Sequence, residues 1–262
     1  MKNIQAVLWV ELLKVRKSSM FWGTIFFFMF VSCMMGMVMF VQLNPEIAGK
    51  LGMIGDKATM LSFGEPNWQN YFKLLLMGIS AIGLVGNGFV ASWVFGREYT
   101  DHTVKDMLVL PISRSSIVFS KFIVIVLWSL ILFFVFLLMG ILVGFLIDIP
   151  NWSGDTVWSS VKTYAITSIL ILSLCTPVAF LASYSRGFLL PLGFVILTLI
   201  VANFTGLVGL GPFFPWAIPG LYATSSGSSI MSLQVVSYII LLTTCLVGLG
   251  GTLAIWRYAD QK

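Results

Sequence analysis

Six long apolar stretches dominate the hydrophobic pattern of this chain. They cover residues 20–42, 74–95, 122–147, 164–182, 188–208 and 235–256, and none of them contains Asp, Glu, Lys, Arg or His. A helix that crosses a bilayer needs about 20 mainly apolar residues. Each stretch therefore predicts one membrane-spanning helix, and we expect an all-α integral membrane protein with six transmembrane helices.

The composition agrees with a membrane environment. Hydrophobic residues make up 58% of the 262 residues and charged residues 10%, with a mean hydropathy of +0.99. A water-soluble globule of this length could not bury so much apolar surface, so membrane lipid is an expected partner. Cys33, Cys175 and Cys245 each lie in a different apolar stretch, and we interpret them as packing residues.

The distribution of Lys and Arg predicts the topology. An even number of spans places both termini on one side of the membrane. If that side is the cytoplasm, 11 of the 15 basic residues face inward and only Lys50, Lys57, Lys73 and Lys162 face outward. The positive-inside rule therefore predicts cytoplasmic N- and C-termini. Because the basic residues are scattered over short loops, nucleic acid is not an expected partner, whereas they suit the anionic inner leaflet.

Residues 1–19 predict an interfacial helix at the N-terminus. Basic residues gather beside the first span, and apolar residues recur with a helical period at Ile4, Val7, Leu8, Leu12 and Val15. Trp9, Val10 and Leu13 interrupt this stripe. The alternative is a plain cytoplasmic extension of the first span, and both interpretations remain open at this point.

The segment 209–234 differs from the other loops. Its core, residues 211–222, is too aromatic for a solvated loop and too rich in proline for a spanning helix. We predict an extracytoplasmic, re-entrant segment, because non-helical backbone at membrane depth must be covered by protein or line a cavity. Candidate pathway-lining residues are Phe213, Phe214 and Trp216, with Asn87 and Asn203 from the spans. The alternatives are an interfacial loop without a transport role and, for the two asparagines, interhelical hydrogen bonding.

The chain lacks the residues that membrane enzymes use. The single histidine, His102, lies in a predicted cytoplasmic loop, and the spans contain no acid or base. No zinc site can be built from one histidine and dispersed cysteines. We therefore expect no catalytic, metal-binding or cofactor-binding residues, and the lack of charge in the spans disfavours an ion-coupled carrier.

The loop 96–121 between the second and third spans predicts a short amphipathic helix. Val104, Met107 and Leu108 form its apolar face, and Pro111 ends it. A short helix held between two spans suits a groove on a cytoplasmic partner. The alternative is that its charged residues form an ordinary solvated face.

A motif in this loop resembles that of ABC transporter permeases of the type-2 export class. The family pattern is E-x(3)-G-T-x(3)-L-L-x-x-P-x-x-R-x(5,6)-K, and the chain matches it at Glu98, Thr103, Lys105, Leu108, Pro111, Arg114 and Lys121. The sequence departs from the pattern at His102 and Val109, where the family has glycine and leucine. The Glu11-Leu-Leu-Lys segment, the six spans and the proline-aromatic segment before the last span also fit this family.

The resemblance implies a single transmembrane permease domain over residues 1–262 of a bacterial plasma-membrane exporter. Its partners would be cytoplasmic ABC ATPase subunits, which bind ATP and Mg, and a second permease subunit, identical or homologous. The absence of a G-x(4)-G-K-[ST] loop agrees with ATP binding on another chain. Residues 101–110 would form the coupling helix. The implied ATPase-coupling residues are Glu98, Thr103, Val104, Lys105, Met107, Leu108, Pro111 and Arg114, and the implied N-terminal interface residues are Glu11, Lys14, Arg16 and Lys17.

Related subunits export, or give immunity to, amphipathic peptide antibiotics, drugs or lipid-like molecules, so an exporter of such compounds is the expected function. The alternative is a membrane scaffold or regulatory partner of an ATPase or sensor complex that transports nothing.

Overall fold

The computed structural model describes residues 2–50, 64–101, 113–225 and 233–258, and these residues form helices and loops without strands. Six helical segments are long and apolar enough to cross a membrane. They are α2 (Ser19–Leu43), α5 (Trp68–Thr100), α7 (Arg114–Leu146), α8 (Gly154–Ser173) together with α9 (Cys175–Ser185), α10 (Leu189–Val208) and α12 (Val235–Tyr258). The predicted all-α membrane fold with six spans is confirmed.

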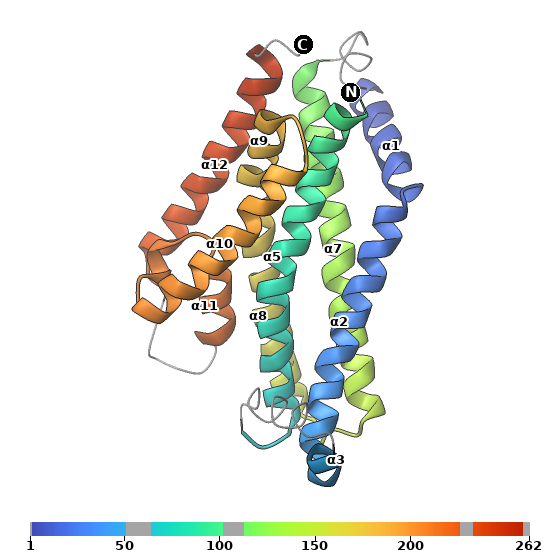
Figure 1. The fold of residues 1–262 in the computed structure, drawn as a ribbon, viewed down its shortest axis with the longest axis vertical. Helices are drawn as coiled ribbons and strands as arrows, with labels where there is room; N and C mark the ends of the chain where they lie inside the picture. The colour runs from blue at the N-terminus through green and yellow to red at the C-terminus, as the bar shows by residue number, and fades with distance from the viewer. Residues whose placement is uncertain (1, 51–63, 102–112, 226–232, 259–262) are drawn as a thin grey trace.

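Shorter helices fill the connections. They are α1 (Lys2–Arg16) before the first span, α3 (Pro45–Lys50) after it, and η1 (Gly211–Phe213) and α11 (Ile218–Ser225) between the last two spans. The N-terminal end of α1 and the C-terminal end of α12 lie at the same end of the bundle as the end of α5 and the start of α7 (Figure 1). We call this the α5–α7 end, and the opposite end the α2–α3 end. The assignment of the α5–α7 end to the cytoplasm stays a prediction from the Lys and Arg distribution.

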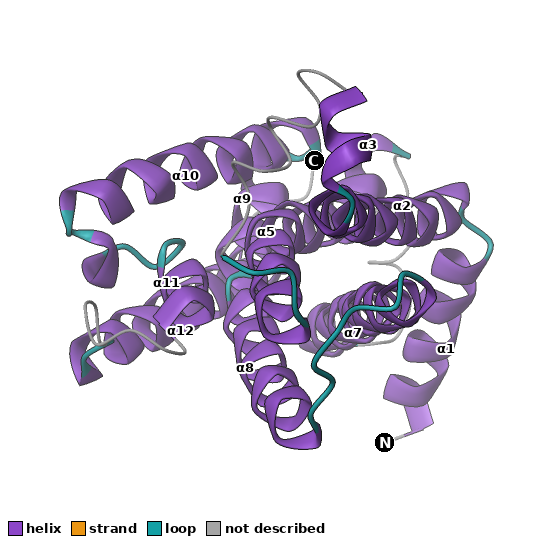
Figure 2. Cartoon of the chain, turned by 90° about the horizontal axis from the view of Figure 1, so that it is seen from below, coloured by secondary structure: helices purple, strands orange, loops and turns teal. Residues whose placement is uncertain are grey.

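Helix α5 occupies the centre of the bundle. It packs against α2, α7, α8, α9, α10 and α11, and the view along the bundle shows these helices around it (Figure 2). Glycines allow this close approach: a Cβ at Gly86 would lie 2.4 Å from Phe28 of α2, and one at Gly88 would lie 2.5 Å from Val195 of α10. The most apolar part of α5 is 67% buried, whereas the corresponding parts of α10 and α12 are 22% buried.

Both helices that flank the predicted coupling loop are longer than their apolar stretches. Helix α5 continues to Thr100, and α7 begins at Arg114 after Ser113, whose hydroxyl accepts a hydrogen bond from the Ser116 amide at 3.2 Å. The two edges of the predicted loop 96–121 are therefore helical. Residues 102–112, which include His102 and most of the expected coupling helix, lie outside the described residues.

The fourth span consists of two helices that meet at Leu174. Pro177 in the first turn of α9 has no amide hydrogen to donate to Ser173, so a continuous helix would lose a backbone hydrogen bond there. The single hydrogen of the Thr176 hydroxyl is donated to the Cys245 carbonyl of α12 at 2.8 Å, and this hydroxyl also lies 3.3 Å from the Ser173 carbonyl. The apolar stretch 164–182 predicted this span as one helix because hydropathy does not register such an interruption.

Candidate functional site

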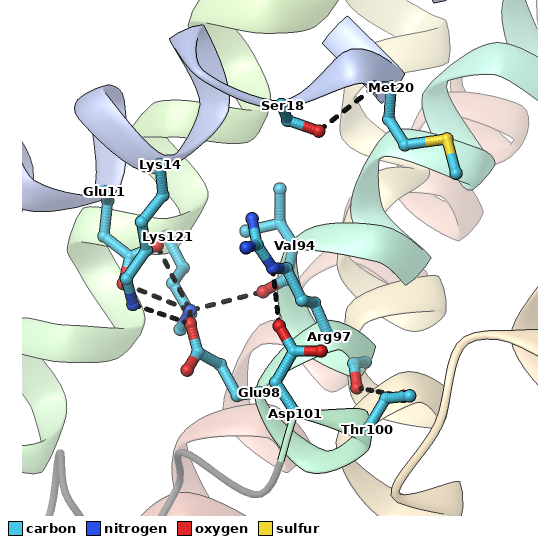
Figure 3. Close-up of polar contacts among 11 residues, drawn as sticks. Glu11, Lys14, Ser18, Met20, Val94, Arg97, Glu98, Thr100, Asp101 and Lys121 are labelled. Atoms are coloured by element: carbon cyan, nitrogen blue, oxygen red, sulfur yellow. Dashed lines mark hydrogen bonds and ion pairs between the residues drawn. The ribbon is translucent and has the colours of Figure 1, made fainter.

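Four ionised side chains from three helices meet at the α5–α7 end of the bundle, and we call them the ion quartet: Glu11 and Lys14 of α1, Glu98 of α5 and Lys121 of α7 (Figure 3). The Lys121 Nζ lies 3.2 Å from Oε2 of Glu11 and 3.0 Å from Oε1 of Glu98. It also donates to the Val94 carbonyl at 3.2 Å. The Lys14 Nζ lies 3.0 Å from the same Glu98 oxygen and 3.4 Å from Oε1 of Glu11.

The quartet is largely removed from water. The exposed fractions of the side chains are 0% for Lys121, 4% for Glu98, 5% for Glu11 and 33% for Lys14. An unpaired buried charge is strongly destabilising, whereas two carboxylates and two ammonium groups neutralise one another. Burial lowers the pKa of Lys14, but the nearby Glu11 and Glu98 carboxylates outweigh this effect, and the pKa is raised above its ordinary value of 10.5.

The sequence of α1 explains how its carboxylate reaches the bundle. Val7, Glu11 and Val15 are spaced four residues apart, and all three are buried. This face of α1 packs on α7. Glu11 therefore occupies the middle of the helix's apolar stripe, where its carboxylate points at Lys121.

A turn at Lys17 and Ser18 separates α1 from the first span. The Ser18 hydroxyl accepts a hydrogen bond from the Met20 amide at 3.1 Å and so caps the N-terminus of α2. Residues 2–16 are thus a helix distinct from α2, while the expected position of that helix in the membrane interface stays a prediction. Of the expected N-terminal interface residues, Glu11 and Lys14 join the quartet, and Arg16 and Lys17 are exposed.

The expected ATPase-coupling residues fall into three groups: one in the quartet, one in contact with α12, and the rest outside the described residues. Glu98 belongs to the quartet. The Arg114 Nη1 donates to the carbonyls of Trp256 at 3.3 Å and Arg257 at 3.2 Å, so this side chain satisfies acceptors in the last turn of α12. The remaining residues of this set lie outside the described residues: Thr103, Val104, Lys105, Met107, Leu108 and Pro111.

The two asparagines expected near a pathway have different surroundings. The Asn87 amide donates to the Ile171 carbonyl of α8 at 2.8 Å and accepts from the Ser129 hydroxyl of α7 at 2.9 Å. It therefore links three spans, which is the interhelical role given above as the alternative. Asn203 is exposed and donates to Leu199 in its own helix at 2.9 Å. A pathway role for either residue stays a prediction.

The segment after α10 packs against the bundle. Helix α11 contacts α5 and α8 and lies alongside these helices rather than beyond their ends (Figure 1). The Trp216 ring lies 5.3 Å from Phe194 and 5.6 Å from Phe214, while Phe213 is exposed. This arrangement gives the segment the protein cover that a re-entrant backbone requires. Its re-entrant position and its role in lining a pathway stay predictions.

Sequence reasoning missed Lys121 as the centre of the site. The sequence places it only at the last position of the motif, yet its ammonium bonds to both buried carboxylates. Two signals were present: Glu11 interrupts the apolar stripe of the first helix, and Lys121 stands at the edge of a long apolar stretch. An ionised residue in either place needs a partner.

Comparison with known proteins gives the site its context. The ABC-2 family transporter protein family matches residues 7–205, which include all four residues of the quartet. The chain belongs to the ABC-2 transporter family. The bacitracin transport permease protein BCRB of Bacillus licheniformis is 23% identical to this ABC-2 permease over 192 residues, which cover 73% of the chain and 89% of that relative. The protein is thus a permease subunit of an ABC transporter, located in a bacterial plasma membrane with several spans.

Proposed function

We propose that this permease is the membrane-spanning subunit of an ATP-driven exporter and that the ion quartet transmits motion from a partner ATPase into the spans. ATP and Mg are bound by that partner, and a second permease subunit, identical or homologous, completes the pathway. The absence of a phosphate-binding loop in the chain supports this division of labour.

The observation that carries the proposal is the position of the quartet. Glu98 lies three residues before the C-cap of α5, Asp101, and Lys121 lies in the second turn of α7. The expected coupling helix, 101–110, falls between these two helix ends. Glu11 joins α7 to α1 through Lys121, and Lys14 of α1 joins α5 through Glu98. A force applied to that connection therefore acts on α1, α5 and α7 together, because buried ion pairs with several hydrogen bonds resist separation.

The substrate class is inferred from the spans. Their apolar stretches contain no ionised residue that would recognise a fixed charge. Amphipathic peptides, drugs and lipid-like molecules match such surroundings, and the relative named above is described as a bacitracin transport permease. We propose that bacitracin-like amphipathic antibiotics are within the substrate range, which would give the cell immunity to them.

The central experiment reconstitutes the permease with its ATP-binding subunits in inside-out vesicles. ATP should drive accumulation of bacitracin in the lumen, and a nonhydrolysable ATP analogue should not. Hydrolysis without movement of any amphipathic probe would favour the scaffold alternative. Failure of an ATP-binding subunit to co-purify with the permease would overturn the proposal.

A single substitution tests the coupling helix. Leu108→Asp should leave membrane insertion intact and reduce substrate-stimulated ATP hydrolysis, because a carboxylate would replace an apolar contact with the partner. Tyr258→Asp is the matched control, since it adds the same charge at an exposed position near the end of α12. Equal stimulation in both variants would show that Leu108 has no coupling role.

A further inference from the structure

A cavity between the α1–α2 turn and the end of α5 has two chemically distinct halves. Its volume is about 610 Å³. Met20, Phe89, Trp93 and Phe188 give it an apolar side. Its polar side consists of Lys14, Lys17, Ser18, Ser19, Arg97, Thr100 and Asp101. In Figure 3 the turn with Ser18 and Met20 lies across from Arg97 and Asp101, with Lys14 at one side.

The polar half carries more positive than negative charge. Three basic side chains line it together with one carboxylate, Asp101, which lies 2.8 Å from Nε of Arg97. This contact uses one of the five guanidinium hydrogens, so the Nη groups of Arg97 still have hydrogens to donate. Among the described residues, no carboxylate lies within ion-pair distance of Lys17.

Two further donors face the same region. The Lys14 ammonium has three hydrogens, and the carboxylates of Glu98 and Glu11 accept two of them. The Ser18 hydroxyl accepts from the Met20 amide, which leaves its own hydrogen for another acceptor. Lys14 is neutralised within the quartet and Arg97 is paired with Asp101, so the net positive charge of this half comes from Lys17. Several converging donors beside that charge suit a phosphate group.

The apolar half opens toward the surroundings of the bundle. Met20 is 47% exposed and Phe188 39% exposed, so both side chains reach the outer surface. Trp93 also lines the cavity, with the Arg97 guanidinium 4.8 Å from the centre of its ring. A ligand with a phosphate at one end and a hydrocarbon chain at the other matches both halves.

We propose that this cavity binds the phosphate headgroup of an anionic membrane lipid, with the first part of an acyl chain against Met20 and Phe188. The site does not depend on the proposed transport function, because it requires only the lining residues and a bilayer beside them. Through Lys14 the bound phosphate would share a donor with the ion quartet.

The test measures binding of fluorescent phosphatidylglycerol to the purified full-length permease in zwitterionic detergent. Lys17→Gln should weaken binding about fivefold, and Lys17→Gln with Arg97→Gln about 25-fold, since each basic residue near a membrane surface contributes a factor of about five. Arg257→Gln is the control, because Arg257 is exposed at the same end of the bundle and does not line the cavity.

Competition identifies the source of the phosphate. Unlabelled phosphatidylglycerol should displace the probe, whereas phosphatidylcholine and glycerol phosphate should be weak competitors. Met20→Asn, which changes only the apolar half, should weaken binding of the lipid and leave glycerol phosphate unaffected. The proposal would be overturned if Arg257→Gln weakened lipid binding as much as Lys17→Gln does. It would also be overturned if phosphatidylcholine competed as well as phosphatidylglycerol. Equal competition by glycerol phosphate would overturn the choice of a lipid as ligand.

Discussion

The two ends of the helix bundle are held together by different chemistry. At the α5–α7 end, the quartet joins α1, α5 and α7 through ion pairs of 3.0 to 3.4 Å. At the α2–α3 end, Trp68 packs among aromatic rings, with centroid distances of 4.6 Å to Trp152 and 5.0 Å to Phe145. Ion pairs require specific partners, whereas aromatic packing depends mainly on shape. The α5–α7 end should therefore tolerate substitution less well.

The two ends also differ in what surrounds their close-packed glycines. A Cβ at Gly96, near the α5–α7 end, would lie 2.7 Å from backbone atoms of Gly187 and Phe188. A Cβ at Gly144, near the other end, would lie 2.6 Å from the edge of the Trp68 ring. Backbone adjusts less readily than a side chain, so a side chain at Gly96 would be harder to accommodate than one at Gly144.

The largest effect is expected from Lys121→Met. It leaves the carboxylates of Glu11 and Glu98 buried with only Lys14 to neutralise them, and should lower the free energy of unfolding by about 3–5 kcal/mol. Thermal unfolding in detergent measures the loss. A triple variant that adds Glu11→Gln and Glu98→Gln should recover much of it, because no unpaired carboxylate remains.

The control for Lys121→Met is Lys162→Met. The Lys162 side chain is exposed and lies over the Trp158 ring at 4.9 Å. Its replacement should change the free energy of unfolding by about 0.5 kcal/mol or less. If the two variants lost the same free energy of unfolding, Lys121 would contribute no more to stability than an ordinary surface charge.

Gly96→Ala should have the next largest effect. The added methyl group must push α5 away from the connection between α9 and α10, which should lower the free energy of unfolding by about 3 kcal/mol. Gly193→Ala serves as the control, since a Cβ there has no neighbour within 4 Å. Equal stability of the two variants would show that this backbone contact is not close in the folded protein.

Trp68→Leu tests the aromatic end. Trp68 is 1% exposed, and leucine keeps the site apolar while losing the ring contacts. The expected loss of unfolding free energy is about 2 kcal/mol, less than for Lys121→Met. Trp158→Leu, at a position that is 62% exposed, should be nearly neutral. A larger loss for Trp68→Leu than for Lys121→Met would reverse the comparison of the two ends.

The smallest effect is expected from pH. Because the pKa of Lys14 is raised above 10.5 in the folded protein, its ionised form stabilises the fold at every pH below that value. This contribution is lost as the pH rises above 10.5 through the folded-state pKa. The stability difference between wild type and Lys14→Gln should therefore be constant from pH 7 to 9 and shrink above pH 10.5. If the difference stayed constant above pH 10.5 as well, the charge of Lys14 would not contribute to the stability of the quartet.

Hydropathy predicted the spans because bilayer thickness fixes both the length and the polarity of a spanning helix. The stretches 20–42 and 235–256 correspond closely to α2 and α12. The expected ends were least accurate for the fourth span, which begins at Gly154 and not at residue 164, and for α5 and α7. The helical turns that were missed contain charged residues. A window of apolar residues stops at Phe95 or begins at Phe122, although both helices continue beyond them.

The quartet could be predicted only in part. Glu11 and Glu98 belong to residue sets that the family resemblance implied, but their shared partner is separated from them by 110 and 23 residues in the sequence. A single sequence shows that Lys121 borders an apolar stretch, and it does not show which carboxylates approach it. That pairing depends on how α1 docks against α7, which is set by tertiary packing.

The long sequence separation between Glu11 and Lys121 has a consequence for biogenesis. Synthesis of Glu11 precedes synthesis of its main counter-ion by 110 residues. A nascent chain with only two inserted spans holds both carboxylates and lacks the third span's ammonium. The first helix can dock fully only after α7 has been inserted, so this junction cannot close before the third of the six spans is in place.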